Sequence, residues 1–443
     1  MGSSVFLPYI YLYSIVFVTF FIYGIFRVFF FLKGKKETSE TRGNVQKRQR
    51  RRNELLLRED RKPYLEKIVY RNHEKKRKER NNNKHQQSRY KEKLKTVDII
   101  LYVIVSLLVF LFIATRHISV GTDTQAYVDF FNHSRYWYQG YKTDFLFEQL
   151  GRFLKLFSNT SEYFIFATSL LCYGGLFFVI LKESRCRVFS LLLFMIMGTS
   201  SIFFFLYLSM IRQGIAMSYF FLSVYFLYQK RLFIYHRILL FMIFYIASIL
   251  THASCLFTLP FIVVVSLKPV ASKVFWLVLI LVTYLMAANN VSIVQSLLGY
   301  AFDVIDVGKY ENYADIAFGE IEAKGWLNMN VLPFIVLALV FLFVCSKREL
   351  KDWKMQFVLF SVVLNNVFFD NLMWSRLILY FSIFMVIVFP NALRHKGFWL
   401  QLSTYFLVFV YFMYKTMTQF IANAAIDATG NIIVPYKSWL FVI

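Results

Sequence analysis

The chain has 443 residues, of which 58% are hydrophobic and 20% aromatic, and its formal net charge is +24. A soluble globular domain is roughly 45–50% apolar, so this composition excludes an ordinary soluble enzyme. Many apolar runs approach the ~20 residues that cross ~30 Å of hydrocarbon, and they are continuous rather than alternating. We therefore predict an all-α polytopic membrane protein and not a β-barrel.

We expect about twelve membrane spans. The first is too long for a signal-peptide core and lacks a cleavage site, so it should be retained. The predicted spans are residues 5–32, 97–115, 160–181, 188–207, 209–228, 232–251, 253–267, 274–289, 330–345, 355–369, 376–390 and 397–416. Residues 1–32 thus hold the first span, residues 33–96 a basic loop, and residues 97–443 a multi-span membrane domain.

The loop after the first span is strongly basic. Between Lys33 and Lys95, 24 Lys and Arg residues face nine Asp and Glu residues. The positive-inside rule places this loop in the cytoplasm and the N-terminus outside. Its expected partners are anionic membrane lipids rather than nucleic acid. The simpler alternative is a solvated, partly disordered loop that only fixes topology.

The remaining connectors support this orientation. Those on the loop's side are each net positive: residues 182–187, 230–237, 268–273, 347–354 and 394–396. The predicted outer loops differ, because residues 116–160 have balanced charge and residues 290–329 hold six acids against two lysines. Within the second loop, residues 291–305 have the spacing of a surface helix. Residues 307–326 are rich in Tyr, acids and Gly, a composition that suits sugar binding but is also common in extracellular loops.

Four polar features from distant parts of the chain fall on the outer side: Gly121-Thr-Asp-Thr124, Arg212, His252 and Arg376. A charge within a span costs roughly 2.5–3.5 kcal/mol, so such residues suggest function. Two arginines can bind a diphosphate through their planar forks, and a carboxylate or imidazole can accept a proton. Charges at the cytoplasmic ends, Arg27 and Asp98, can instead reach the headgroups.

Each feature also has a structural interpretation. Arg212 can bond a carbonyl or extend outward, Arg376 can pair with Asp370, and His252 can simply form a turn. Asp123 and Thr124 can cap the following helix, since both residue types are favoured N-caps. The four cysteines form no Cys-x-x-Cys pair, and no acidic pair has metal-ligand spacing. We therefore expect no disulfide framework, no metal and no cofactor.

The polar features belong to longer motifs: "VGTDTQAYVDFF", "IRQGIAMSYFFLSVYFLYQK", "ILTHAS", "SRLILYF" and "VPYK". Together these resemble the EpsG-type family of Wzy-like polysaccharide polymerases over roughly residues 97–443. The family's motifs fall on Gly121, Asp123, Thr124 and Tyr127; on Arg212, Gln213 and Ala216; on Ala247 to His252, with slightly longer spacing; on Arg376 and Tyr380; and on Pro435, Tyr436 and Lys437. The long basic loop departs from the family and suggests an added regulatory or docking role.

The resemblance implies polymerisation of undecaprenyl-diphosphate-linked oligosaccharide repeat units into exo- or capsular polysaccharide at the outer face of the bacterial cytoplasmic membrane. Lipid-linked donor and acceptor units are the implied substrates, and flippase and chain-length regulator proteins are candidate partners. Arg212 and Arg376 would bind the diphosphate, with Arg116 a third candidate. Asp123 or His252 would be the general base. The supporting residues would be Gly121, Thr122, Thr124, Tyr127, Gln213 and Tyr436.

Two other functions compete with polymerisation. A lipid-linked-sugar glycosyltransferase or polysaccharide ligase would use the same arginines. A flippase or transporter should carry charges deep along its path, whereas these spans are almost uncharged at their centres. The sequence has no P-loop and no Gly-rich nucleotide fingerprint, so a nucleotide-sugar donor is not expected.

Overall fold

A computed structural model describes residues 7–26, 92–133, 145–198, 202–288, 332–368, 372–393, 398–426 and 436–440. Within these ranges the chain is nearly all helical, and extended backbone pairs only in the isolated bridges Arg116–Ser438 and Gly198–Ile202. The predicted all-α class is therefore confirmed. The chain forms two compact units, one of Met1–Ser14 with Ser106–Ile443 and one of Ile15–Val105. The candidate site lies in the first unit.

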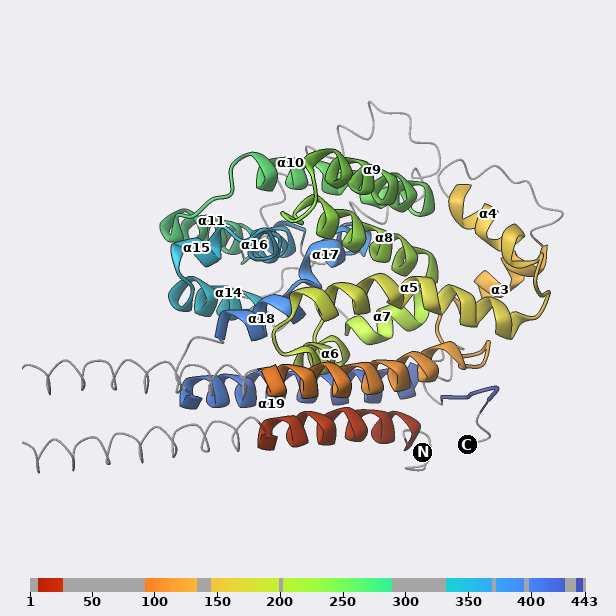
Figure 1. Cartoon of the computed structure of the whole chain (residues 1–443). Helices are drawn as coiled ribbons and strands as arrows, with labels where there is room; N and C mark the ends of the chain where they lie inside the picture. Colours follow the sequence, from red (N-terminus) through yellow and green to blue (C-terminus); the bar gives the residue numbers. More distant parts are fainter. Residues whose placement is uncertain are drawn as a thin grey trace, which may run out of the picture. The chain divides into compact units, whose positions relative to one another are not determined.

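Two helices, Leu7–Phe26 and Glu92–Ala114, precede the labelled ones. The labelled helices follow in chain order (Figure 1): α3 Thr124–His133, α4 Phe145–Leu154, α5 Ser161–Glu183, α6 Arg187–Ile196, α7 Phe203–Ser209, α8 Ile211–Leu227, α9 Ile234–Thr251, η2 Ala253–Thr258, α10 Leu259–Leu267, α11 Lys273–Ala288, α14 Leu332–Val344, α15 Lys347–Leu350, α16 Trp353–Val367, α17 Leu372–Ser382, α18 Met385–Leu393 and α19 Phe398–Ile426.

Among the described residues, five helices are long and apolar enough to cross a membrane, or six if α7 and α8 form one bent span. The chain is accordingly a membrane protein. The expected count of about twelve spans stays a prediction, because several predicted ranges hold apolar helices of 10–17 residues. Most of the basic loop, the predicted surface helix at 291–305 and the Tyr-rich stretch at 307–326 lie outside the described residues.

One of the predicted spans is interrupted. Residues 188–207 do not form one helix, because α6 ends at Ile196 and α7 begins only at Phe203. The intervening sequence includes Gly198-Thr-Ser-Ser201, whose residue types favour turns over helix interiors. A hydropathy run has no signal for such a break, which explains the difference. Residues 376–390 lie in α17 and α18, and Arg376–Leu393 together is long and apolar enough to cross a membrane.

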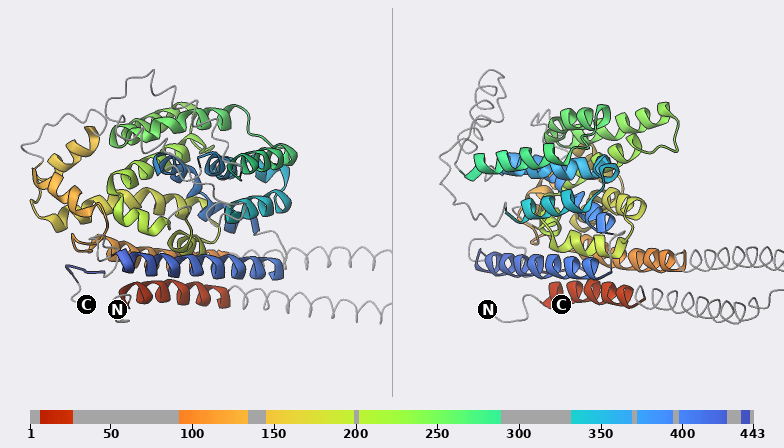
Figure 2. Two further views of the ribbon diagram at one scale, coloured as in Figure 1. Left: turned by 180° about the vertical axis from the view of Figure 1, so that it is seen from behind. Right: turned by 90° about the vertical axis from the view of Figure 1, so that its left-hand side faces the viewer.

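Small residues hold the centre of the first unit together. The views agree that α8 lies between α9 and α5 (Figures 1 and 2). The Gly175 amide donates to the Ser218 hydroxyl at 2.8 Å, and a Cβ at Gly175 would lie 2.4 Å from the Ser218 carbonyl oxygen. At Gly214 a Cβ would lie 2.1 Å from the sulfur of Cys172. Both glycines therefore permit the close approach of α5 and α8 that is typical of membrane helix pairs.

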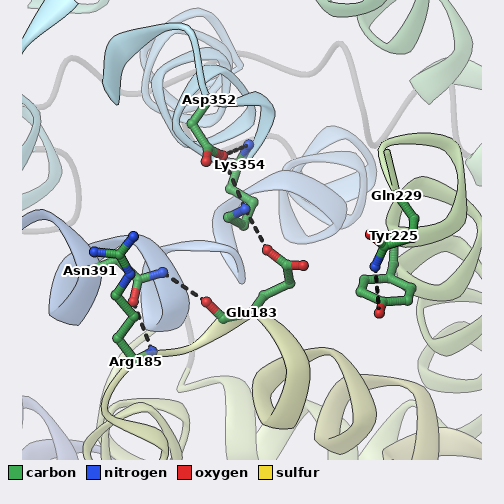
Figure 3. Close-up of polar contacts among 7 residues, drawn as sticks. All are labelled: Glu183, Arg185, Tyr225, Gln229, Asp352, Lys354 and Asn391. Atoms are coloured by element: carbon green, nitrogen blue, oxygen red, sulfur yellow. Dashed lines mark hydrogen bonds and ion pairs between the residues drawn. The ribbon is translucent and has the colours of Figure 1, made fainter. Parts of the chain in front are cut away.

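Polar residues of the first unit gather in two groups. One, which we call the Arg212 end, is the candidate site around Arg212, Gln213 and Arg376 and is described below. The other, which we call the lysine end, consists of Glu183, Arg185, Asp352, Lys354 and Asn391 (Figure 3). The Lys354 ammonium lies 2.7 Å from Glu183, and the Asn391 amide donates to the Glu183 carbonyl at 2.9 Å. The lysine end joins three connectors that the sequence predicts to lie on one side of the membrane.

Candidate functional site

The candidate site is built around the break between α7 and α8. These helices are bent by 119° relative to each other, and Met210 joins them. Arg212 and Gln213 therefore stand in the first turn of α8. The first amides of a helix have no partner within it, and the helix dipole is positive there, so this position favours anions. Arg212 is partly exposed, whereas only 3% of Gln213 is exposed.

The turn Gly121–Thr124 docks on the end of α7. Gly121 has φ 101°, and a Cβ there would lie 2.7 Å from the carbonyl oxygen of Leu208, so only glycine fits without strain. The Thr122 amide donates to the Ser209 hydroxyl at 3.3 Å. The Thr124 hydroxyl donates to the Val120 carbonyl at 2.7 Å. The turn therefore rests on Leu208 and Ser209, which precede Arg212 by four and three residues.

Tyr127 brings the predicted residues together. It lies on α3, one turn after the docked segment, and is half-buried. Burial raises the pKa of Tyr127, the positive charges of Arg212 and Arg376 lower it, and the carboxylate of Asp123 raises it. Three predicted site residues from three segments therefore lie within electrostatic reach of one phenol.

Gln213 connects the start of α8 to α17. Its side-chain amide donates to the backbone carbonyl of Arg376 at 2.9 Å. One turn further along α17, the Tyr380 hydroxyl lies 3.3 Å from the Ser254 hydroxyl. These contacts fix the backbone that carries Arg376 against both α8 and η2.

His252 forms the corner between α9 and η2. Its amide donates to the Ser248 carbonyl at 2.9 Å, and its carbonyl accepts from the Cys255 amide at 3.1 Å. The Ser248 hydroxyl bonds the Ala216 carbonyl of α8 at 2.7 Å, which holds the end of α9 against α8. His252 thus lies two residues from the Ser254 contact with α17, but only 9% of it is exposed. The turn interpretation of His252 describes its backbone well, and its proposed chemistry stays a prediction.

Arg116 and Tyr436 lie together beside the segment that leads into the docked turn. Arg116 is 1% exposed, and its guanidinium donates to the Ile113 carbonyl at 2.7 Å and to the Ser169 hydroxyl at 3.0 Å. The Tyr436 ring stacks on Phe112 with centroids 3.9 Å apart. Arg116 is almost fully buried, whereas Arg212 is partly exposed, so the role of Arg116 in diphosphate binding stays a prediction.

A family model matches residues 99–438 and is described as the EpsG family. The chain belongs to the EpsG family. The match includes every predicted site residue, from Arg116 to Tyr436, and leaves out the first helix and all of the basic loop at residues 33–96. No curated protein and no solved structure matches the chain. EpsG-family membership is consistent with a membrane protein of polysaccharide biosynthesis.

Several residues that shape this EpsG-family site have no sequence signal. Ser209, Ser169 and Ser254 each provide a hydroxyl that holds a site segment in place. Lone serines in apolar runs are too common to single out, so only the structure identifies these three. Within the described part of the chain, no three His, Cys, Asp or Glu residues are grouped so that they could hold a metal ion.

Proposed function

We propose that this EpsG-family protein polymerises oligosaccharide repeat units carried on undecaprenyl diphosphate, at the outer face of the bacterial cytoplasmic membrane. The observation that supports this best is a pair of hydrogen bonds, Thr122 to Ser209 and Gln213 to the Arg376 carbonyl, which hold the segments that carry Asp123, Arg212 and Arg376 against one another. Two cations and one carboxylate at the end of membrane helices suit a reaction in which an anionic leaving group departs and a hydroxyl loses a proton.

In this proposal Arg212 and Arg376 bind the diphosphate of the donor. Guanidinium groups stay protonated and bind phosphate oxygens through two parallel hydrogen bonds. The charge on the diphosphate grows as its bond to the sugar breaks, so the two arginines stabilise the transition state more than the bound substrate. Gln213 supports the pair by holding the backbone of Arg376.

Asp123 is the preferred general base. A hydroxyl oxygen of the acceptor unit bonds to the anomeric carbon of the donor, the bond from that carbon to the diphosphate breaks, and the hydroxyl proton passes to the carboxylate. Asp123 is partly exposed beside the arginines, whereas His252 is nearly buried. This difference favours Asp123 over His252, which is the second candidate.

The test uses a strain that lacks this protein, complemented with wild type, Arg212→Ala or Arg231→Ala at matched membrane levels. Arg231 is an exposed arginine in the connector between α8 and α9 and serves as the matched control. Lipid-linked saccharides and surface polymer are extracted and sized. We expect Arg212→Ala and the null strain to lose polymer and accumulate single repeat units on lipid, with Arg231→Ala unchanged.

Other outcomes would contradict the proposal in distinct ways. Normal polymer in Arg212→Ala would remove the diphosphate role of that residue. Full-length polymer left on the lipid in the null strain would indicate a ligase. Repeat units confined to the inner leaflet would indicate a flippase.

A further inference from the structure

The last described segment, Tyr436–Leu440, runs beside the residues that follow the helix Glu92–Ala114; we call it the C-terminal strap. The His117 amide donates to the Lys437 carbonyl at 2.7 Å, and the Trp439 amide donates to the Thr115 carbonyl at 3.0 Å. Between these bonds, Arg116 and Ser438 form an antiparallel bridge. The strap is therefore paired through backbone bonds with residues 115–117.

Side chains strengthen this pairing. The Ser438 hydroxyl lies 2.9 Å from the Thr115 carbonyl oxygen and 3.1 Å from the Thr115 hydroxyl. The Tyr436 ring stacks on Phe112, and its hydroxyl donates to the Phe112 carbonyl. Burial raises the pKa of Tyr436 to about 12, so this hydroxyl keeps its proton at neutral pH. Tyr9 adds an edge contact to the Tyr436 ring, with centroids 5.7 Å apart.

The residues that the strap pairs with lead directly into the docked turn. The Val120 amide donates to the His117 carbonyl at 2.9 Å, which closes a tight turn just before Gly121. Between the strap and this turn, Arg116 is fixed on α5 through Ser169. Only a few residues separate these contacts from Asp123, and they are hydrogen-bonded. A displacement of residues 115–117 would therefore also displace Asp123.

We infer that the C-terminal strap sets the position of the Gly121–Thr124 turn, and that Arg116, Tyr436 and Ser438 are positioning residues for Asp123. This inference rests on the proposed function. Removal of the strap would leave the Thr115 carbonyl and the His117 amide without their backbone partners, and such loss costs free energy and order. The arginines of the site stand on α8 and α17, so their placement does not depend on the strap.

Because the strap holds Asp123 and other elements hold the arginines, changes in the strap should affect kcat and KM differently. Tyr436→Phe combined with Ser438→Ala keeps the aromatic stack but removes the side-chain hydrogen bonds. We expect kcat for polymerisation to fall on the order of 10-fold, because a small displacement of a catalytic group is costly. KM for the lipid-linked unit should stay within about 2-fold, since diphosphate binding lies on other elements. Leu440→Ala, an exposed strap residue, is the matched control and should match wild type.

A reversible crosslink tests the inference most directly. The hydroxyls of Thr115 and Ser438 lie 3.1 Å apart, so Thr115→Cys with Ser438→Cys places two sulfurs within reach of a disulfide. The four native cysteines are all buried, and none of them forms a disulfide in the structure. We expect the reduced double variant to show a lowered kcat and oxidation to restore it. Loss of activity on oxidation would mean that the strap must open, and equal activity of wild type and both forms would mean that it is dispensable; either result overturns the inference.

A second readout separates this inference from the proposed function. Thr122 is exposed on the docked turn, so Thr122→Cys can be labelled with a membrane-impermeant maleimide without any activity assay. In the Tyr436→Phe, Ser438→Ala background we expect its labelling rate to change several-fold, and in the Leu440→Ala background to stay the same. An unchanged rate in the first background overturns the positioning role. A changed rate, together with normal polymer in the strain that lacks this protein, would overturn only the proposed function.

Discussion

The lysine end and the Arg212 end of the first unit both place cations near buried surface, but they satisfy them differently. At the lysine end, Lys354 lies 2.7 Å from Glu183 and 3.2 Å from Asp352. Burial alone would lower the pKa of Lys354, but the two carboxylates outweigh burial and raise it. The protein itself thus supplies the counter-charges at this end.

At the Arg212 end, the corresponding hydrogen bonds hold the backbone and a neighbouring tyrosine rather than a charged group. Gln213 bonds the backbone of Arg376 rather than its guanidinium, and Ser254 bonds Tyr380. No ion pair joins Arg376 to a carboxylate in the part of the chain that the structure describes. The contrast teaches that carboxylates of the fold neutralise Lys354, whereas the bond from Gln213 holds the backbone of Arg376, a cation that binds an external anion in the proposed function.

Among the substitutions that test this contrast, Arg212→Lys should have the largest effect on polymer formation. Lysine keeps the positive charge but lacks the planar fork, so it cannot hold a phosphate through two parallel bonds. We expect polymer formation to fall on the order of 10²-fold, as for removal of one transition-state donor. Polymer yield and the melting temperature of the purified protein are measured together. Near-normal yield would show that charge alone is sufficient.

Gly121→Ala should have the next largest effect on polymer formation. The added Cβ would meet Leu208, and the backbone is in a region that alanine rarely adopts. We expect a loss of about 1–3 kcal/mol in unfolding free energy and a clear loss of polymer. Gly174→Ala is the matched control, because a Cβ there meets nothing within 4 Å, and it should be neutral or slightly stabilising. Equal behaviour of the two variants would mean that the turn is not docked as described.

Lys354→Met tests the lysine end. It removes the partner of Glu183 and Asp352 while keeping most of the side-chain volume, so we expect about 1–3 kcal/mol of lost stability but near-normal polymer per folded molecule. The raised pKa means that the ammonium's contribution is complete below pH 10.5, its ordinary value, and is lost as the pH rises through the higher folded value. The melting-temperature difference from wild type should therefore hold from pH 7 to about pH 9. Loss of polymer in a stable Lys354→Met protein would remove the distinction between the two ends.

Tyr127→Phe should have the smallest effect. It removes one hydroxyl beside the arginines and keeps the ring contact with Phe147. We expect a 2- to 10-fold fall in polymer formation, about the contribution of one hydrogen bond. Because burial raises the pKa of Tyr127 above 10, the pH profile of polymerisation should be the same for variant and wild type below pH 9. A changed profile would show that Tyr127 itself titrates in the reaction.

The sequence predicts much of this structure through local patterns. Continuous apolar runs located helices in every predicted span that the structure describes, and the grouping of Asp123, Arg212 and Arg376 followed from counting which end of each helix they occupy. The break between α6 and α7 was not predicted, because mean hydropathy measures how apolar a segment is and not whether its helix is continuous. The strap was missed because Ser438 meets Thr115 across 323 residues, and no spacing rule reaches that far. Tyr436 was noted only as part of a family motif.

The short length of α8 has a consequence for the depth of the proposed reaction. Its 17 residues correspond to about 25 Å, which is less than the ~30 Å of a hydrocarbon core. If α8 stands upright with its Tyr228 end at one interface, as the proposed orientation requires, Arg212 lies a few ångström below the other. A phosphate that reaches this depth is still attached to a tail dissolved among acyl chains. The carrier lipid would then never need to be lifted out of its leaflet, and the growing sugar chain would leave the membrane while its anchor stays behind.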